Sequence, residues 1–292
     1  MKFGVLILPE ERWEASRDRW LEADELGYDH AWTYDHLSWR TLRDGPWFGA
    51  VPVLAAAAAV TRRIALGPLV ASPNFRHPVT FAKELLTLDD ISGGRMIVGL
   101  GSGAPGADTA VLGEDALSPS ERADRWSEFV RFTDELLREP ATTRRGTHYT
   151  AVDARMHPGA LARPRPPLAL AAAGPRAMAL TAQCADIWIT MGSSGRRDAR
   201  PSLDEAVRQL HRMRRVWADA GRDPADLRSL VHAGRVGAPL HDTGAFGEFA
   251  AACAEAGFTD LVLPWPRSSG VFEGSPRLVA EVAERVMPTL RG

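Results

Sequence analysis

Short apolar runs alternate along the chain with longer stretches whose apolar residues recur at the spacing of an α-helix. The short runs are rich in Leu and β-branched residues, which is typical of parallel strands that are buried on both faces. They predict eight strands, at Phe3–Leu8, Asp29–Tyr34, Ile64–Val70, Met96–Leu100, Leu168–Ala172, Ile187–Thr190, Leu230–Val236 and Asp260–Leu263.

A helical stretch follows each of these strands. The predicted helices are Arg17–Leu26, Phe48–Val60, Val79–Asp90, Pro119–Leu137, Arg176–Cys184, Leu203–Ala220, Phe246–Ala256 and Pro276–Met287. Gly27 and Gly257 stand just past helix ends, where a left-handed residue is favoured. The string Ser118-Pro119-Ser120-Glu121 supplies a capping serine, a proline at the first helical position and an acid three residues after the cap. Repeated strand–helix units predict an α/β fold, and eight of them fit a (β/α)8 TIM barrel.

One connection is longer than the others. From Pro140 to Pro167, between the fourth helix and the fifth strand, the chain is rich in Arg, Gly, Pro and His. The strand–helix alternation resumes beyond it without a change of composition. We therefore interpret it as an insertion, at about residues 140–167, within a single domain that spans residues 1–292.

The composition is that of a globular protein. Apolar residues make up 45% of the chain, charged residues 25%, and the formal net charge is −2. This balance gives no overall attraction for nucleic acid, so we expect a small-molecule partner. The apolar run at the N-terminus is too short for a signal peptide or a membrane span, which predicts a cytoplasmic location and no membrane partner. Cys184 and Cys253 lack further ligands at metal-site spacing, so we expect packed thiols and no metal.

A glycine-rich string follows the run Met96–Leu100. Gly101-Ser102-Gly103-Ala104-Pro105-Gly106 matches the dinucleotide-binding pattern G-x-G-x-x-G. In a nicotinamide-binding Rossmann unit these glycines lead directly into a helix, whereas here a further loop runs to the next capping residue, Ser118. The context therefore argues against a Rossmann unit. Two interpretations stay open: the glycines let the backbone approach a flat ring or a phosphate at a strand end, or they form a plain turn.

Several strings together resemble luciferase-like monooxygenases and deazaflavin-dependent reductases. The longest runs from Leu66 to Pro78 and continues over Leu88–Gly103, and shorter ones lie at Gly27–His36, Ala173–Arg176, Ala185–Trp188 and Gly257–Asp260. Together they span nearly the whole chain. The resemblance implies a (β/α)8 barrel of the luciferase-like flavin- or deazaflavin (F420)-dependent oxidoreductase superfamily, with the cofactor in the mouth of the barrel.

The resemblance also implies where the cofactor binds. In these families a non-proline cis peptide at the end of the third strand forms a bulge behind the ring, which predicts a cis bond between Leu69 and Val70; a regular strand end is the alternative. The string Gly174-Pro175-Arg176 resembles the phosphate loop, and a helix start with an arginine suits an anion, although an ordinary turn has the same residues. The predicted cofactor-binding residues are Leu69, Val70, Ala71, Gly101, Ser102, Gly103, Ala173, Gly174, Pro175 and Arg176.

His36 is the first candidate for proton transfer. With Asp35 it follows the second predicted strand, where barrel enzymes place catalytic groups, and an imidazole exchanges protons near pH 7. The deazaflavin-dependent sugar-phosphate dehydrogenases that the chain resembles have a histidine at the matching place; a structural role is the alternative. Those enzymes also have a Glu where this chain has Ala104, which puts that specific activity in doubt. Asp108 or Glu114 could replace it, or both are solvated loop acids.

The predicted substrate pocket has aromatic walls and a cationic side chain. Trp13, Trp39 and Trp265 are near predicted strand ends, and Arg267 could meet an anionic substrate; each could equally be a packing residue.

Two chemistries fit the resemblance. The favoured one uses reduced coenzyme F420 to give a hydride to an activated C=C, C=N or C=O bond, and the alternative uses reduced FMN and oxygen in a monooxygenase reaction. A barrel that has lost catalysis and only binds a ligand is a third possibility. The resemblance also implies a homodimer.

Overall fold

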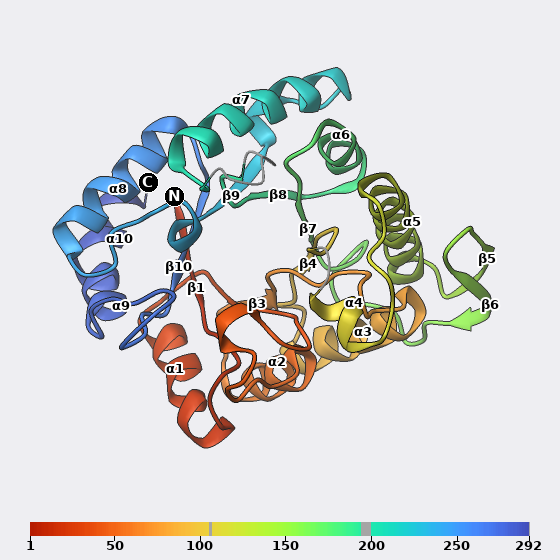
Figure 1. The fold of residues 1–292 in the computed structure, drawn as a ribbon, viewed down its shortest axis with the longest axis horizontal. Coiled ribbons are helices and arrows are strands. Elements are labelled where there is room, and N and C mark those ends of the chain that lie inside the picture. The colour runs from red at the N-terminus through yellow and green to blue at the C-terminus, as the bar shows by residue number, and fades with distance from the viewer. Residues whose placement is uncertain (105–106, 194–199, 292) are drawn as a thin grey trace. The chain divides into compact units, whose positions relative to one another are not determined.

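The computed structural model describes residues 1–104, 107–193 and 200–291. Eight strands form one mostly parallel, nearly closed sheet with helices between successive strands, so the fold is the predicted (β/α)8 barrel (Figure 1). The strand order is β3-β2-β1-β10-β9-β8-β7-β4, and the bridges Leu66–Met96 and Ala71–Leu100 join β3 to β4.

The chain divides into two compact units. The first comprises Met1–Ile7, Arg19–Trp32 and Leu170–Gly292, and the second comprises Leu8–Asp18 and Thr33–Ala169.

The first unit is centred on β1, which pairs in parallel with β2 and β10. Its strands are β1 (Lys2–Leu6), β8 (Ile187–Thr190), β9 (Arg228–His232) and β10 (Asp260–Pro264), with β2 (His30–Thr33) and β7 (Leu168–Ala171) divided between the units. Its helices are α6 (Pro175–Cys184), α7 (Leu203–Asp219), α8 (Thr243–Ala256), α9 (Leu278–Glu281) and α10 (Met287–Leu290), with most of α1 (Trp13–Glu25). Since β8 and β10 are buried along their whole length, their continuous apolar pattern is the one expected for parallel strands.

Helix ends in this unit follow the local signals. Gly27 and Gly257 adopt left-handed conformations, with φ of 78° and 92°, and end α1 and α8 as predicted. The ninth strand is shorter than the predicted Leu230–Val236, because Ala233–Arg235 turns into a 3-10 helix. At the C-terminus, a π-helical turn at Val282–Val286 separates α9 from α10 inside the predicted helix.

The second unit contains the remaining elements. They are β3 (Ala65–Pro68), β4 (Val98–Leu100), β5 (Ala141–Arg145), β6 (Thr150–Arg155), α2 (Ala50–Val60), α3 (Pro78–Ser92), α4 (Ala107–Val111) and α5 (Pro119–Arg138). The capping box of Ser118 and Glu121 starts α5 as predicted, and Pro78 is the first residue of α3. The stretch interpreted as an insertion holds the antiparallel hairpin of β5 and β6, which the sequence did not predict.

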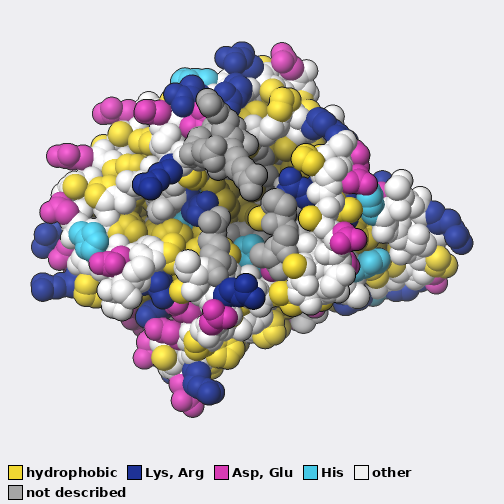
Figure 2. Space-filling view, viewed as in Figure 1, with side chains coloured by type: hydrophobic (Ala, Val, Ile, Leu, Met, Phe, Trp, Pro, Cys, Tyr) yellow, Lys and Arg dark blue, Asp and Glu magenta, His cyan; other side chains and the backbone are white. Residues whose placement is uncertain are grey.

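Charged side chains are mixed in sign on the molecular face drawn in Figure 2, where arginines and lysines are interspersed with acids. None of the described helices is long and apolar enough to cross a membrane. Cys253 is buried, which raises the pKa of its thiol to about 12, and Cys184 is half-buried; neither forms a disulfide. Both therefore fit the expected packed thiols.

Candidate active site

The ends of β2, β3 and β4 meet through backbone hydrogen bonds in the second unit. The Leu69 amide donates to the Thr33 carbonyl at 2.8 Å, and the amides of Ala71 and Gly101 donate to the carbonyls of Gly99 and Ala71, each at 2.9 Å. The carboxyl ends of these three strands thus lie together, and they carry residues that are predicted to contact a cofactor or a substrate. The peptide bond between Leu69 and Val70 is cis, as the sequence predicted.

The glycine-rich turn is anchored by a buried asparagine. The Asn74 Nδ2 donates to the Ala104 carbonyl at 2.9 Å, and its Oδ1 accepts from the Arg125 Nη2 at 2.9 Å. Gly103 has a φ of 73°, and a Cβ atom there would come within 2.5 Å of the Asn74 amide nitrogen. A side chain would therefore collide with the anchor, which explains why this position is a glycine. The last two residues of the G-x-G-x-x-G string, Pro105 and Gly106, lie outside the described residues.

His36 is paired with a buried carboxylate. Its Nδ1 lies 2.8 Å from the Asp108 Oδ2, and the other oxygen of Asp108 accepts the Leu37 amide at 2.8 Å. Asp108 is 3% exposed and His36 is 23% exposed. The Leu37 amide thus fixes the carboxylate, and the carboxylate orients the imidazole through Nδ1. The other ring nitrogen, Nε2, is outside this contact.

Asp35 has a different environment from its neighbour. Its two carboxylate oxygens accept from the Arg76 Nη2 at 2.7 Å and the Arg76 Nε at 3.1 Å, and Asp35 is 2% exposed. Arg76 also binds Glu84 at 3.0 Å and lies over the rings of Phe75 and Phe81. Burial lowers the pKa of Arg76, but the hydrogen bond and charge of Asp35 outweigh it and the net shift is upward. Asp35 is therefore held as one half of a two-point ion pair.

Aromatic side chains surround the histidine. Tyr34 contacts His36 edge-on at 6.1 Å between ring centroids and contacts Trp39 at 4.9 Å. Trp39 stacks on Trp47 at 5.9 Å, and the indole nitrogen of Trp47 donates to the His36 carbonyl at 2.9 Å. The predicted pocket residue Trp39 is only 5% exposed, so it belongs to the wall that supports His36.

The other predicted pocket residues are Trp13, Trp265 and Arg267, and each has its own local contacts or exposure. Trp13 begins α1 and is half-buried in the second unit. In the first unit Trp265 is half-buried below the guanidinium of Arg19, at 5.7 Å from its ring centroid. Arg267 donates to the Ser269 carbonyl at 2.7 Å, so its guanidinium holds its own loop.

The predicted phosphate residues form the start of α6 in the first unit. Ala173, Gly174, Pro175 and Arg176 are all exposed. Gly174 is the N-cap residue, no side chain caps the helix, and a Cβ atom at Gly174 would have no neighbour within 4 Å. The start of this helix can therefore receive an anion.

Two features of the site were not predicted. The pairing of His36 with Asp108 joins residues 72 positions apart, although Asp108 was one of two acids considered as replacements for the absent Glu. The pairing of Arg76 with Asp35 was missed, and the only sequence signal was a charged residue after each of two neighbouring predicted strands. Among the described residues, no group of three or more His, Cys, Asp or Glu side chains is placed to hold a metal.

The fold and site fit one family of barrel enzymes. The model of the luciferase-like monooxygenase family matches residues 1–264, and the chain belongs to this family.

The chain is also similar to individual enzymes of known activity. The chain is 30% identical over 237 residues to the F420-dependent glucose-6-phosphate dehydrogenase of Microbacterium testaceum, a match that covers 76% of this chain and 63% of that protein. It is 32% identical over 219 residues to the 4-hydroxyprotoasukamycin monooxygenase of Streptomyces nodosus subsp. asukaensis, covering 72% of this chain and 55% of that protein. The chain spans 51–63% of the length of the glucose-6-phosphate dehydrogenases of M. testaceum, Amycolatopsis mediterranei and Beutenbergia cavernae.

Solved structures support the fold. The F420-dependent tetrahydromethanopterin reductase of Methanopyrus kandleri superposes with a TM-score of 0.79 at 18% identity over 99% of both chains. An F420-dependent secondary alcohol dehydrogenase in complex with an F420–acetone adduct gives a TM-score of 0.82 at 18% identity, over 100% of this chain and 99% of that one.

Proposed function

We propose that the chain is an F420-dependent oxidoreductase that transfers a hydride to an activated C=C, C=N or C=O bond of a small molecule. The observation that most directly supports this proposal is the pair of His36 and Asp108, which follows the hydrogen-bonded ends of β2, β3 and β4. The similarity to F420-dependent enzymes supports the choice of cofactor. When bound, the reduced deazaflavin supplies the hydride, and the protein supplies alignment and a proton.

Each unit has residues that fit one part of such a cofactor. In the second unit, Gly101 has no side chain and donates its amide to the Ala71 carbonyl, so the backbone after β4 can approach a flat ring at Leu69–Ala71. In the first unit, the uncapped start of α6 at Gly174 offers backbone N–H groups and a positive dipole end to a phosphate, and Arg176 adds a charge. The binding roles of these residues are part of the proposal.

His36 is the proton carrier in this proposal. Because Nδ1 is held by Asp108, the proton that is exchanged with the substrate is on Nε2. Asp108 fixes the orientation of the ring through its contact with Nδ1, which makes Asp108 a positioning residue. Asp35 is engaged at both oxygens by Arg76, so its role is to hold the strand end and not to transfer a proton.

A second candidate is an FMN-dependent monooxygenase. The similarity to the 4-hydroxyprotoasukamycin monooxygenase favours it, as does the wall of Tyr34, Trp39 and Trp47, because oxygen insertion needs a pocket that is shielded from water. Both candidates use the same proposed ring site, so cofactor affinity separates them.

The test is a parallel titration of the purified protein with F420 and FMN, followed by quenching of the fluorescence of its nine tryptophans. Tight binding of F420 with weak binding of FMN supports hydride transfer, and the reverse result supports the monooxygenase. Binding of neither cofactor overturns both and leaves a catalytically inactive ligand-binding barrel.

A variant then tests the proton carrier. His36→Gln should bind F420 with wild-type affinity, because the proposed ring and phosphate contacts are made by other residues. It should oxidise reduced F420 at least about 100-fold more slowly with any substrate that the wild type accepts. His77→Gln is a matched control, because the His77 ring caps α3 by accepting the Val79 amide at 3.3 Å and contacts the Tyr149 ring, and it has no role in the proposed proton transfer.

The location and assembly are also proposals. A cytoplasmic homodimer is consistent with a chain whose described helices include no membrane span, and it follows the family resemblance. Light scattering of the purified protein should give twice the chain mass of 31.8 kDa.

A further inference from the structure

A cavity of about 670 Å³ opens at the beginning of the strands in the first unit. It is lined by Met1, Lys2, Asp29, Arg228, Ala254, Gly257, Phe258, Thr259, Asp260 and Arg291. Lys2, Arg228 and Asp260 are the first residues of β1, β9 and β10. The cavity therefore lies where the strands of the first unit begin, and the proposed function does not use it.

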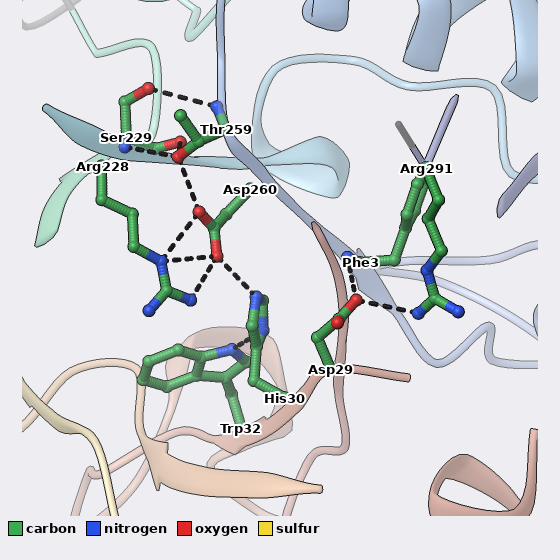
Figure 3. Close-up of polar contacts among 9 residues, drawn as sticks. All are labelled: Phe3, Asp29, His30, Trp32, Arg228, Ser229, Thr259, Asp260 and Arg291. Carbon is green, nitrogen blue, oxygen red and sulfur yellow. Dashed lines mark hydrogen bonds and ion pairs between the residues drawn. The ribbon is translucent and has the colours of Figure 1, made fainter. Parts of the chain in front are cut away.

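One of its two carboxylates is fully engaged inside the protein. Asp260 is fully buried, and its Oδ1 accepts from the Arg228 Nη2 at 2.5 Å and the His30 Nε2 at 3.0 Å, while its Oδ2 accepts from the Thr259 hydroxyl at 2.6 Å (Figure 3). The Trp32 indole donates to the His30 Nδ1 at 2.7 Å, so Nε2 is the ring nitrogen that donates to Asp260. Arg228 supplies the guanidinium charge beside Asp260.

The other carboxylate is held through one oxygen and is partly exposed. The Asp29 Oδ2 accepts from the Phe3 amide and from the Arg291 Nη2, each at 2.8 Å, and the side chain is 30% exposed. The same Arg291 nitrogen also donates to the Gly27 carbonyl at 2.6 Å. Each arginine is therefore paired with one aspartate, Arg228 through Nε and Nη2 and Arg291 through Nη2 alone.

Cationic hydrogen-bond donors remain at the cavity. Figure 3 shows that one terminal nitrogen of Arg228 and one of Arg291 point away from the carboxylates. Arg228 is 26% exposed and Arg291 is 38% exposed, so solvent reaches both. Lys2 adds an exposed ammonium group, so the cavity has three cationic side chains and two carboxylates, which leaves one positive charge in excess.

We propose that this cavity is a second ligand site, which binds a small organic anion through a phosphate or carboxylate group. One terminal nitrogen of each guanidinium can donate a charge-assisted hydrogen bond to such an anion, and the ammonium of Lys2 adds a point charge. Phe258 and Ala254 give the apolar part of the ligand a surface to pack on. A volume of about 670 Å³ is in the range of small-molecule sites.

The sequence provides an internal control for a footprinting test, because Lys2 and Lys83 are its two lysines. Lys83 lies on α3 in the second unit and donates to the Arg155 carbonyl at 2.7 Å. The protein is acetylated with limiting reagent, with and without phenyl phosphate, and each site is quantified by mass spectrometry. Phenyl phosphate should slow the modification of Lys2 at least about fivefold and leave Lys83 unchanged. The proposal would be overturned if neither phenyl phosphate nor benzoate, each added separately, changed the rate of Lys2 acetylation.

Calorimetry identifies the chemistry of the ligand. Phenyl phosphate and benzoate are titrated in parallel, with benzyl alcohol as the uncharged comparison, and the tighter anion defines the preferred group. Lys2→Ala and Arg291→Gln should each weaken binding at least about fivefold, whereas Arg277→Gln, an exposed arginine outside the cavity, should not. Benzyl alcohol that binds as tightly as the anions, or variants that all bind equally, would contradict an anion site.

This test is independent of the proposed function. The titration with F420 should give the same affinity for Lys2→Ala as for the wild type. A failed anion test leaves the oxidoreductase proposal standing, and a failed F420 test leaves the anion site standing.

Discussion

The buried ion pair of Arg228 and Asp260 allows a quantitative prediction about stability. Arg228→Met keeps most of the length of the side chain and removes the guanidinium, which leaves the buried carboxylate with His30 and Thr259 as its polar contacts. Breaking a buried pair by removing one partner costs about 3–5 kcal/mol. Because Arg228 is 26% exposed and water can partly replace it, we expect a loss at the lower end, about 3 kcal/mol.

The pH dependence of this loss has a definite sign. Burial raises the pKa of Asp260, but the hydrogen bonds from His30 and Arg228 outweigh it and hold that pKa well below its usual range. A carboxylate whose pKa is depressed in the folded state stabilises the protein above its unfolded pKa, and this stabilisation is lost as the pH falls through the folded value. Arg228→Met removes much of this depression, so the gap between wild type and variant should be larger at pH 7 than at pH 3, which lies below the unfolded pKa of about 3.9.

The assay is urea unfolding at pH 7 and pH 3, with thermal melting as a second measurement. A loss of about 3 kcal/mol corresponds to a fall in Tm of roughly 6 °C or more. Arg212→Met is the matched control, because Arg212 is 43% exposed and its bond to Glu205 lies on the surface of α7; it should cost less than about 1 kcal/mol. The reasoning is refuted if Arg228→Met costs no more than the control, or if its cost is the same at both pH values.

Three further predictions concern the site and the first unit. Asp108→Asn keeps an acceptor for the Leu37 amide and removes the charge beside the imidazole, so turnover should fall roughly 10- to 100-fold while the affinity for F420 stays unchanged. The turnover of the control variant Glu114→Gln should stay within about twofold of the wild type. Equal effects of the two variants in steady-state assays would contradict the pairing of His36 with Asp108. Gly103→Ala should lower the melting temperature more than Gly113→Ala. Both glycines have a φ of 73°, but only a Cβ at residue 103 would collide with another side chain, that of Asn74. Equal losses in melting temperature would exclude this collision. Burial lowers the pKa of His232 to about 3, so the free energy of unfolding should fall as the pH drops below about 6.5, by about 2 kcal/mol between pH 7 and pH 5. Urea unfolding of His232→Gln should show a smaller fall over the same pH range. An equal fall in wild type and variant would contradict this assignment.

The elements of the barrel were predictable because their signals are local. The strand Ile187–Thr190 and the capping box at Ser118 appear as the sequence predicted, since apolar runs, proline and capping residues act within a few positions of themselves. The hairpin of β5 and β6 was missed because its exposed strands lack the apolar runs that identified the others. The extension of the ninth strand to Val236 was wrong for the opposite reason, because its apolar residues continue into a turn.

The sequence by itself determined the fold class, the family and the candidate positions after the strands, because each depends on strings of neighbouring residues. Only the tertiary structure decided which charges pair. His36 meets Asp108 across 72 positions and Arg228 meets Asp260 across 32, whereas the adjacent Asp35 is engaged by Arg76. A parallel sheet brings residues from separate strand ends to one edge, and the resulting pairs depend on strand order and side-chain direction, which no local pattern encodes.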